Sequence, residues 1–387
     1  MRLGIDGGCW SNRRGYGRFT RELLTAVARR DRASEFILFL DSNAADEFPV
    51  PRRLEVRRVS TSAAVNEAAR ADGRRRVGDL WRMARAVAQQ PLDAFFFPSV
   101  YSYFPLSPGV PVIVGVHDTI AERRPELTFA SRKHELFWRI KVWMALARAD
   151  RVLTVSEYSR RSIHEYYRVP LSRIHVVSEG VAPVFRKMPV DPPARPFILY
   201  AGGISPHKNL STLIAAYERI RARRPGVQLI LVGDYQSDHF KSCYAELREQ
   251  VRCAGLLEDV IFAGYVPDEE LCRLYNSAAL FVMPSLDEGF GLPALEAMTC
   301  GAPVVVSSGN ALEEVVGDAG LVVAPNDVAA LAEAMDRVLG DPLLAQQLSE
   351  RGLRRSRAFS WDRAAEAFLE VVRSMVNPPP TPTTAGR

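Results

Sequence analysis

Residues 280–301, LFVMPSLDEGFGLPALEAMTCG, contain the strongest local pattern in this 387-residue chain. Leu280–Met283 is a short apolar run typical of a buried strand. Gly289 and Gly291 follow it, and glycines allow the backbone to approach a ligand closely. Pro293 suits the first turn of a helix, because its missing N–H costs nothing there. The segment therefore predicts a strand, a glycine loop and a helix.

The start of this predicted helix has the chemistry of a binding site. Its free amides and partial positive charge would attract an anion such as a diphosphate. Glu288 lies just before the helix and Glu296 about one turn into it. Carboxylates accept hydrogen bonds from pairs of hydroxyls, which sugars and riboses both present. An acidic helix start with a second glutamate facing solvent would give the same spacing, so spacing alone leaves both interpretations open.

Strands and helices alternate along most of the chain, which indicates βαβ units and parallel sheets covered by helices on both faces. The second half shows this rhythm most clearly. The predicted strands are Leu3–Ile5, Phe36–Leu40, Ala94–Phe97, Pro111–Val116, Arg151–Val155, Ile174–Val177, Phe197–Ala201, Val227–Val232, Val260–Ala263, Leu280–Met283, Val304–Val306 and Leu321–Val323.

A proline-rich segment divides the chain into two halves. Residues 183–196 contain five prolines, which lack the N–H that helix and sheet interiors need. The charge changes at the same place: residues 1–196 hold 33 Lys and Arg against 21 Asp and Glu, a balance of +12, and the remainder holds 17 against 24, a balance of −7. We expect two α/β domains whose strand ends face each other across an interdomain cleft. The expected segments are a domain at 1–182, a linker at 183–196, a domain at 197–358, a terminal helix at 359–376 and a disordered tail at 377–387.

The stretch Glu288–Glu296 resembles the E-x7-E motif of the retaining glycosyltransferases of family 4. These enzymes have the GT-B fold, in which two Rossmann-like, doubly wound α/β domains face each other across a cleft. The resemblance covers most of the chain, and four further segments match family elements in the same order. They are the N-terminal glycine loop Ile5–Arg18, the segment Val114–Asp118, the phosphate-contacting loop Ala201–Leu210 and Phe359–Trp361, which begins a helix that crosses back to the first domain.

The resemblance implies a role for each matching residue. Glu288 would hold hydroxyls of the donor sugar, and Glu296 the ribose diol of the nucleotide. Lys208 would neutralise the diphosphate, because charge develops there as the glycosidic bond breaks. His117 would lie beside the reacting sugar, so that the expected catalytic residues are His117, Lys208 and Glu288. The other expected donor-binding residues are Gly15, Gly17, Gly203, His207, Gly289, Phe290, Gly291 and Leu292.

The chain departs from the family pattern near Lys208. Many members have an arginine early in this loop or directly before the lysine, where this chain has Gly202 and Gly203, and His207. A protonated His207 or an arginine from elsewhere could supply the second positive charge.

The implied function is transfer of a hexose, with retention, from a nucleotide diphosphate sugar to a glycan or lipid-linked acceptor. No D-x-D sequence occurs, so we expect neither a metal nor another cofactor. The glycine loop and His117 look most like those of bacterial mannosyltransferases, which favours GDP-mannose weakly over a UDP-hexose. The alternative is a non-catalytic nucleotide-sugar-binding protein with a degenerate site.

Two other functions fit the sequence less well. A dinucleotide fingerprint would need a third glycine, and Thr20 stands at that place. The basic first half could suggest nucleic acid, but its arginines are dispersed without aromatic stacking platforms, so we expect no nucleic-acid partner.

We expect the protein in the cytoplasm, because the N-terminal apolar run breaks at Asp6 and the five cysteines are scattered without a C-x-x-C. We also expect peripheral, salt-sensitive attachment of the first domain to an anionic membrane. Residues 131–149 predict an amphipathic helix, in which Phe137, Trp138, Ile140, Trp143 and Met144 stand among basic residues. Further basic stretches are Arg52–Arg58 and Arg74–Arg76. Aromatic side chains buried in the core, with solvated cations, remain the competing interpretation.

Overall fold

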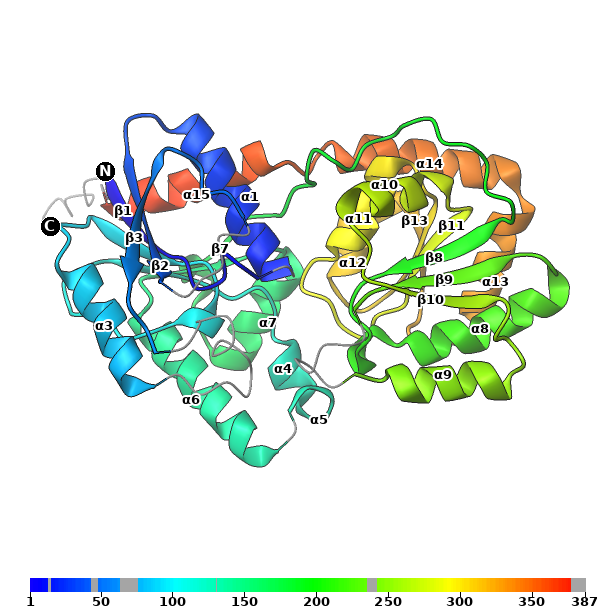
Figure 1. Ribbon diagram of the computed structural model, residues 1–387, viewed down its shortest axis with the longest axis horizontal. Helices are drawn as coiled ribbons and strands as arrows, with labels where there is room; N and C mark the ends of the chain where they lie inside the picture. The colour runs from blue at the N-terminus through cyan, green and yellow to red at the C-terminus, as the bar shows by residue number, and fades with distance from the viewer. Residues whose placement is uncertain (13–14, 43–47, 63–75, 130, 235–241, 377–387) are drawn as a thin grey trace, which may run out of the picture.

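The computed structural model describes residues 1–12, 15–42, 48–62, 76–129, 131–234 and 242–376. The predicted disordered tail, and Arg74 and Arg75 of the predicted basic surface, lie outside these residues. The described chain folds into two α/β domains that lie side by side (Figure 1). No helix in the described part is long and apolar enough to cross a membrane.

The first domain is built on a parallel sheet. Its described strands follow the order β3-β2-β1-β4-β5-β6-β7. The strands are β1 (Arg2–Asp6), β2 (Glu35–Asp41), β3 (Leu54–Val59), β4 (Ala94–Phe97), β5 (Val112–Gly115), β6 (Arg151–Thr154) and β7 (Ile174–Val176). The helices are α1 (Gly15–Arg30), α3 (Val77–Ala88), α4 (Ile120–Arg123), α5 (Pro125–Thr128), α6 (Arg132–Arg148) and α7 (Glu157–Tyr167), with 3-10 turns η1 (Val100–Ser102) and η2 (Leu171–Arg173).

The second domain repeats this architecture with the strand order β10-β9-β8-β11-β12-β13. Its strands are β8 (Phe197–Ala201), β9 (Gln228–Val232), β10 (Val260–Gly264), β11 (Leu280–Met283), β12 (Val304–Ser307) and β13 (Gly320–Val323). Its helices are α8 (Leu210–Arg223), α9 (Tyr244–Cys253), α10 (Asp268–Ser277), α11 (Leu292–Cys300), α12 (Ala311–Val316), α13 (Val328–Gly340) and α14 (Pro342–Ser356), with 3-10 turns η3 (Pro206–Lys208) and η4 (Gly317–Ala319).

The fold class predicted from the sequence is confirmed, and one strand was missed. Within each sheet the neighbouring strands pair in parallel, and β8, β11 and β12 are buried along their whole length, as expected when helices cover both faces. The missed strand is β3, at the edge of the first sheet. Its four middle residues, Glu55–Arg58, are exposed, so it shows no continuous apolar run.

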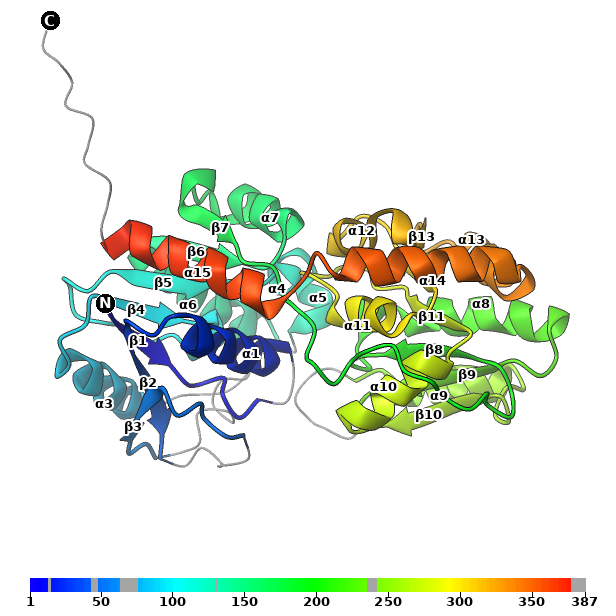
Figure 2. The same ribbon diagram turned by 90° about the horizontal axis from the view of Figure 1, so that it is seen from above.

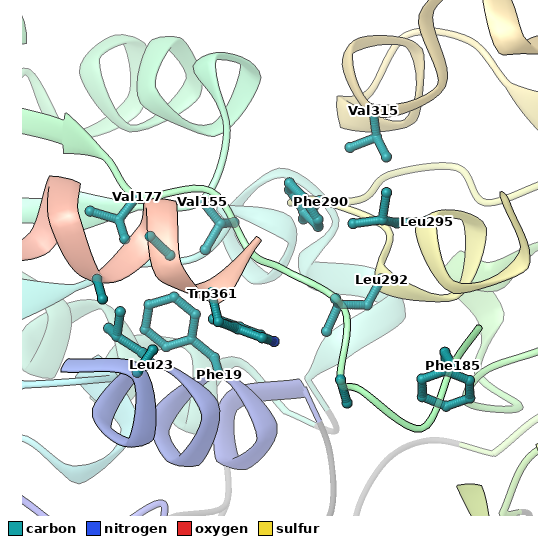
Figure 3. Close-up of a cluster of buried hydrophobic side chains, with 14 of the residues drawn as sticks. Phe19, Leu23, Val155, Val177, Phe185, Phe290, Leu292, Leu295, Val315 and Trp361 are labelled. Carbon is teal, nitrogen blue, oxygen red and sulfur yellow. The ribbon is translucent and has the colours of Figure 1, made fainter. Parts of the chain in front are cut away.

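The last helix, α15 (Trp361–Val376), joins the first domain although α14 belongs to the second. Figure 2 shows α15 lying along α1. The ring of Phe368 packs 4.8 Å from that of Phe96 in β4, and Trp361 packs edge-on against Phe19 of α1 at 5.9 Å. These contacts extend one apolar cluster from the first domain into the second (Figure 3).

The helix predicted at residues 131–149 is present as α6, but the prediction that it is amphipathic is wrong. Its inward face is apolar and includes the buried Trp138 and Val142. Its outward face is apolar as well, because Phe137, Ile140 and Trp143 are exposed. Apolar residues therefore surround the helix, although only one side of it packs on the sheet.

Candidate active site

The predicted site residues come from loops that follow strands of both sheets. Lys208 ends the turn η3 after β8, and Glu288 lies in the loop between β11 and α11. His117 follows β5, and the N-terminal glycine loop follows β1. Because each parallel strand delivers its loop at its carboxyl end, the two sheets bring these residues to the boundary between the domains.

Lys208 and Glu288 form a direct ion pair. The Lys208 Nζ donates to the Glu288 Oε1 at 2.6 Å, and both side chains are largely buried. An ammonium has three donors and a carboxylate has about four acceptor sites, so each group keeps hydrogen-bonding capacity beyond this pair. The pair can therefore accept a phosphate on the lysine side and sugar hydroxyls on the glutamate side.

Glu296 lies in α11 with a side chain that is only 3% exposed. The guanidinium of Arg18, from α1, pairs with its Oε1, and the Tyr275 hydroxyl donates to its Oε2 at 3.1 Å. Burial raises the pKa of Glu296 to about 7, although Arg18 and Tyr275 favour the charged form. The carboxyl group is thus poised to change its charge near neutral pH.

Arg18 links the two domains across their boundary. Besides Glu296, it reaches Asp268 at the start of α10, with its Nη2 2.7 Å from Oδ1 and 2.8 Å from Oδ2. Its guanidinium also lies 5.5 Å from the ring centre of Phe185 in the linker. The sequence showed Arg18 only as the residue that opens a helix after a glycine loop, and that position was the one available signal.

The glycines of the E-x7-E loop are required by contacts within the protein. A Cβ on Gly289 would lie 2.6 Å from the carbonyl oxygen of His117 in the first domain. The Gly289 carbonyl accepts hydrogen bonds from the hydroxyls of Ser156 at 2.7 Å and Ser159 at 3.1 Å. Gly291 has a φ of +107°, and a Cβ there would lie 2.3 Å from Leu312. The close approach at Gly289 is to the first domain, whereas that at Gly291 is to α12 of its own domain; the expected approach of a ligand stays a prediction.

Phe290 and Leu292, which the resemblance assigned to the donor, lie in the apolar cluster shared by the domains. The Phe290 ring packs edge-on against Phe359 at 5.7 Å. Both residues are buried with Val155 and Trp361 (Figure 3). Their side chains therefore fix the loop between β11 and α11 against the first domain.

His117 is buried at the end of β5. Its Nε2 lies 3.0 Å from the Pro98 carbonyl oxygen, and its Nδ1 lies 3.7 Å from a carboxylate oxygen of Glu179. The rings of Phe19 and Tyr16 pack edge-on against the imidazole. Burial raises the pKa of Glu179, which sequence reasoning did not single out. These contacts hold the imidazole in one orientation next to the Gly289 loop.

The surroundings of His207 disfavour its charged form in this ligand-free structure, and its expected role as a second cation stays a prediction. Burial and the neighbouring Lys208 lower its pKa to about 4, so the imidazole is neutral near pH 7. Its carbonyl oxygen accepts a hydrogen bond from the Leu286 amide at 2.8 Å, which ties the Lys208 loop to the E-x7-E loop. In this structure the His207 backbone thus holds the Lys208 loop against the E-x7-E loop.

The three remaining predicted glycines differ in how tightly they are held. A Cβ on Gly17 would lie 1.8 Å from the Asn12 carbonyl oxygen, so the fold of the N-terminal loop requires glycine there. Gly15 has nothing within 4 Å of such a Cβ, and Gly203 has only the Ser205 hydroxyl at 3.8 Å. The space beside Gly15 and Gly203 leaves their backbone accessible.

Further polar contacts close the boundary between the domains. Arg123 of α4 lies 3.2 Å from the carboxylate of Asp287, whose pKa burial raises to about 6. Glu314 of α12 accepts hydrogen bonds at 3.0 Å from the amides of Glu157 and Tyr158, the first residues of α7. These contacts join parts of the two edges that face each other at the domain boundary.

A small pocket lies in the first domain next to this boundary. Aromatic rings and carboxylates, together with His117, make up much of its wall. The Tyr16 hydroxyl donates to Asp118 at 3.1 Å, and the Trp138 indole donates to Glu122 at 2.6 Å. Its lining includes Tyr16, Tyr101, His117, Asp118, Glu122 and Trp138.

Two family models match adjacent parts of the chain. Residues 13–184 match "Glycosyltransferase Family 4", and residues 184–355 match "Glycosyl transferases group 1". Among curated proteins, O-antigen chain mannosyltransferase B of Escherichia coli is 36% identical over 246 residues, which make up 59% of this chain and 62% of that protein. The match thus spans less than two thirds of that relative.

Solved structures show the same fold over nearly the whole chain. Sucrose-phosphate synthase from Thermosynechococcus elongatus has a TM-score of 0.78 at 22% identity, over 97% of this chain and 99% of that one. Anabaena HepE, solved in complex with UDP-glucose, has a TM-score of 0.72 at 19% identity, over 97% of this chain and 100% of that one. With both domains matched by family models and the GT-B fold shared with these structures, the chain belongs to glycosyltransferase family 4.

Proposed function

We propose that this protein transfers a hexose from a nucleotide diphosphate sugar to a glycan or lipid-linked acceptor, with retention of configuration. The observation that carries the proposal is the buried Lys208–Glu288 pair at the start of α11, with Glu296 eight residues further on. A cation, a helix N-terminus and two carboxylates together match a ligand that has a diphosphate between two sets of hydroxyls.

Each of these groups has one task in the proposed reaction. Lys208 and the amides at the start of α11 stabilise the negative charge that grows on the leaving nucleoside diphosphate. Glu288 accepts hydrogen bonds from hydroxyls of the transferred sugar, and Glu296 from the ribose diol. His117, held by the Pro98 carbonyl, lies beside the proposed position of the sugar. The acceptor hydroxyl attacks the anomeric carbon from the face on which the diphosphate departs. The new C–O bond forms as the bond to the diphosphate breaks, and the hydroxyl proton passes to the departing phosphate oxygen, so the configuration is retained.

We propose that the reaction needs no divalent cation, because Lys208 and the α11 dipole supply the positive charge that a metal would otherwise provide. Excess chelator should then leave the rate nearly unchanged. A preparation that loses activity in chelator and recovers it with magnesium would contradict this part of the proposal.

We propose that the acceptor approaches from the first domain. Aromatic rings and the carboxylates of Asp118 and Glu122 surround the small pocket beside His117, which has room for about one water molecule, so the acceptor would meet these groups at the rim of the pocket. Aromatic faces pack against the apolar faces of sugars, and carboxylates bind their hydroxyls. Asp118→Asn should therefore raise the KM for the acceptor, and it should change the affinity for the donor nucleotide much less.

GDP-mannose is the favoured donor, supported by the 36% identity to a protein named as a mannosyltransferase. A UDP-hexose is the competitor. Thermal-shift measurements with GDP, UDP, GDP-mannose and UDP-glucose would rank the donors, and the product formed from the best donor would give its anomeric configuration. Stabilisation by UDP compounds alone would reject GDP-mannose.

The competing function is binding of a nucleotide sugar without catalysis. The neutral His207 favours it, since the phosphate loop then has only Lys208 as a cation. Slow hydrolysis of the donor in the absence of acceptor distinguishes the two, because a transferase site activates the leaving group and a binding protein leaves the donor intact.

A further inference from the structure

The outward face of α6 is an exposed apolar surface on the first domain. Phe137 is 59% exposed and Trp143 is 67% exposed. The exposed residues 137, 140 and 143 are spaced by three, and 136, 140 and 144 by four. These are the spacings of neighbours on one helix face, so the exposed side chains form one stripe along α6. The stripe consists of Leu136, Phe137, Ile140, Trp143 and Met144.

The helix α3 presents a second exposed aromatic on the same side of the domain. Its Trp81 is 71% exposed, and Val77, one turn earlier, is also exposed. The inward residues of α3 and α6, among them Met83 and Val142, belong to one apolar cluster beneath one face of the sheet. Both helices lie at the lower side of the first domain, away from α1 and α15 (Figure 1).

Physical chemistry makes this surface unusual for a helix that faces only water. A surface helix of a globular protein has an apolar stripe toward the core and polar residues opposite. In α6 the outward stripe is as apolar as the inward one. Leaving several large apolar side chains together in water forgoes a favourable transfer for each of them, and such patches mark interaction surfaces.

The charge of the helix indicates what covers the stripe. Among its residues α6 has Arg132, Lys133, Arg139, Lys141 and Arg148 against one acid, Glu135. Arg132 and Lys133 are exposed at its N-terminal end. Two copies of this face packed together would place like charges side by side. A bilayer with anionic headgroups accepts both the cations and the apolar side chains, and tryptophan favours the headgroup level.

We propose that the outward face of α6, extended by Trp81 of α3, docks the protein on an anionic membrane surface. The inward side of the same helix contributes Trp138 and Val142 to the pocket beside His117. Docking would therefore place the lipid surface one helix diameter from the proposed acceptor pocket. This inference rests on the proposed function only for the position of the acceptor pocket. The membrane docking can therefore be refuted while the proposed transfer reaction still holds.

The first test is co-sedimentation with vesicles. The full-length protein should pellet with vesicles of phosphatidylglycerol and phosphatidylcholine at low salt, be released at high salt, and stay in solution with pure phosphatidylcholine. The variant Arg132→Gln/Lys133→Gln loses two cations near the surface, each contributing about 1 kcal/mol to binding. Because about 1.4 kcal/mol corresponds to tenfold, it should bind the vesicles about 30-fold more weakly. Arg219→Gln/Arg248→Gln, which changes two exposed arginines of the second domain, should bind like the wild type.

The apolar stripe needs its own variants. Phe137→Ser and Trp143→Ser should each weaken vesicle binding at least about tenfold. The matched control is Leu343→Ser, which changes a leucine that is 64% exposed on α14 of the second domain. Hydrolysis of the donor in solution should be the same in all three variants, which shows that they fold and keeps a failure of docking separate from a failure of the proposed function.

A spectroscopic readout tests the orientation. Brominated anionic lipids should quench the fluorescence of the exposed Trp81 and Trp143, whereas Trp10, Trp138 and Trp361 are buried and should stay unquenched. The variant Trp81→Phe/Trp143→Phe should lose the quenching. Equal recovery in the supernatant with anionic and neutral vesicles would overturn the proposal. A wild-type dimer that Phe137→Ser converts to a monomer, without vesicle binding, would assign the stripe to a second copy instead.

Discussion

If Glu296 binds the ribose as proposed, its raised pKa should make nucleotide binding dependent on pH. Its carboxyl group is buried between Arg18 of α1 and Tyr275 and Asp268 of α10, and burial is the largest influence on its pKa, which lies at about 7. The proposed role, accepting two hydrogen bonds from a ribose diol, needs the ionised form, because a protonated carboxyl group uses one oxygen as a donor. Affinity should therefore rise as the pH rises through 7 and fall as it drops below 7.

The size of the effect follows from the ionised fraction. With a pKa of about 7, roughly one tenth of Glu296 is ionised at pH 6 and roughly nine tenths at pH 8. If only the ionised form binds the diol, affinity for the nucleoside diphosphate should increase about tenfold between these values, which corresponds to about 1.4 kcal/mol. An ordinary glutamate, with a pKa near 4.3, would be ionised at both values and would give no change.

Isothermal titration calorimetry with GDP and with UDP at pH 6, 7 and 8 measures this effect. The matched control is Glu296→Gln, which keeps the shape of the side chain but does not titrate. The ligand phosphates and Asp287 also titrate near pH 6, and they do so equally in both proteins. The ratio of wild-type to Glu296→Gln affinity should therefore show this change of about tenfold. A ratio that stays constant from pH 6 to pH 8 would refute the assignment of Glu296 to the ribose.

Three further predictions concern neighbouring residues. Lys208→Ala should lower turnover on the order of a hundredfold, because it removes the cation next to the leaving group; initial rates at saturating donor measure this, and a change in KM alone would argue against the role. Gly289→Ala should cost about 1–3 kcal/mol in denaturant unfolding, since its Cβ would lie 2.6 Å from the His117 carbonyl oxygen. Gly78→Ala, with open space around its Cβ, serves as the control and should be neutral or slightly stabilising. Arg18→Ala removes the ion pairs to the second domain and should increase the radius of gyration of the ligand-free protein in X-ray scattering; an unchanged radius would mean that the other contacts alone hold the domains together.

The sequence alone predicted the parallel α/β architecture, because buried strands leave continuous apolar runs that can be recognised locally. β11 and the helix after it appear where the run Leu280–Met283 and Pro293 predict them. The edge strand β3 was not predicted, because exposed charged residues interrupt the apolar run that marks a buried strand. The E-x7-E motif could be found for a similar reason, since its spacing is a property of one loop and one helix turn.

Only the tertiary structure determined which groups the site residues meet. The partner of Glu288 is Lys208, 80 residues away, and that of Glu296 is Arg18, 278 residues away. The neutral state of His207 also depends on how deeply its loop is buried. The pairing of β8 with β11 brings Lys208 to Glu288 within the second sheet, and the approach of the two domains brings Arg18 to Glu296; local sequence patterns record neither event.

The helix α6 also shows what the sequence could not predict. Its residues predicted a helix correctly, but they could not show which aromatic side chains are buried, because apolar residues occur all around it. Packing on the sheet buried Trp138 and left Trp143 exposed. The sequence determined that the segment is helical and rich in apolar and basic residues, whereas the position of the sheet decided which of its faces remained at the surface, since only contact with a neighbouring element removes a side chain from water.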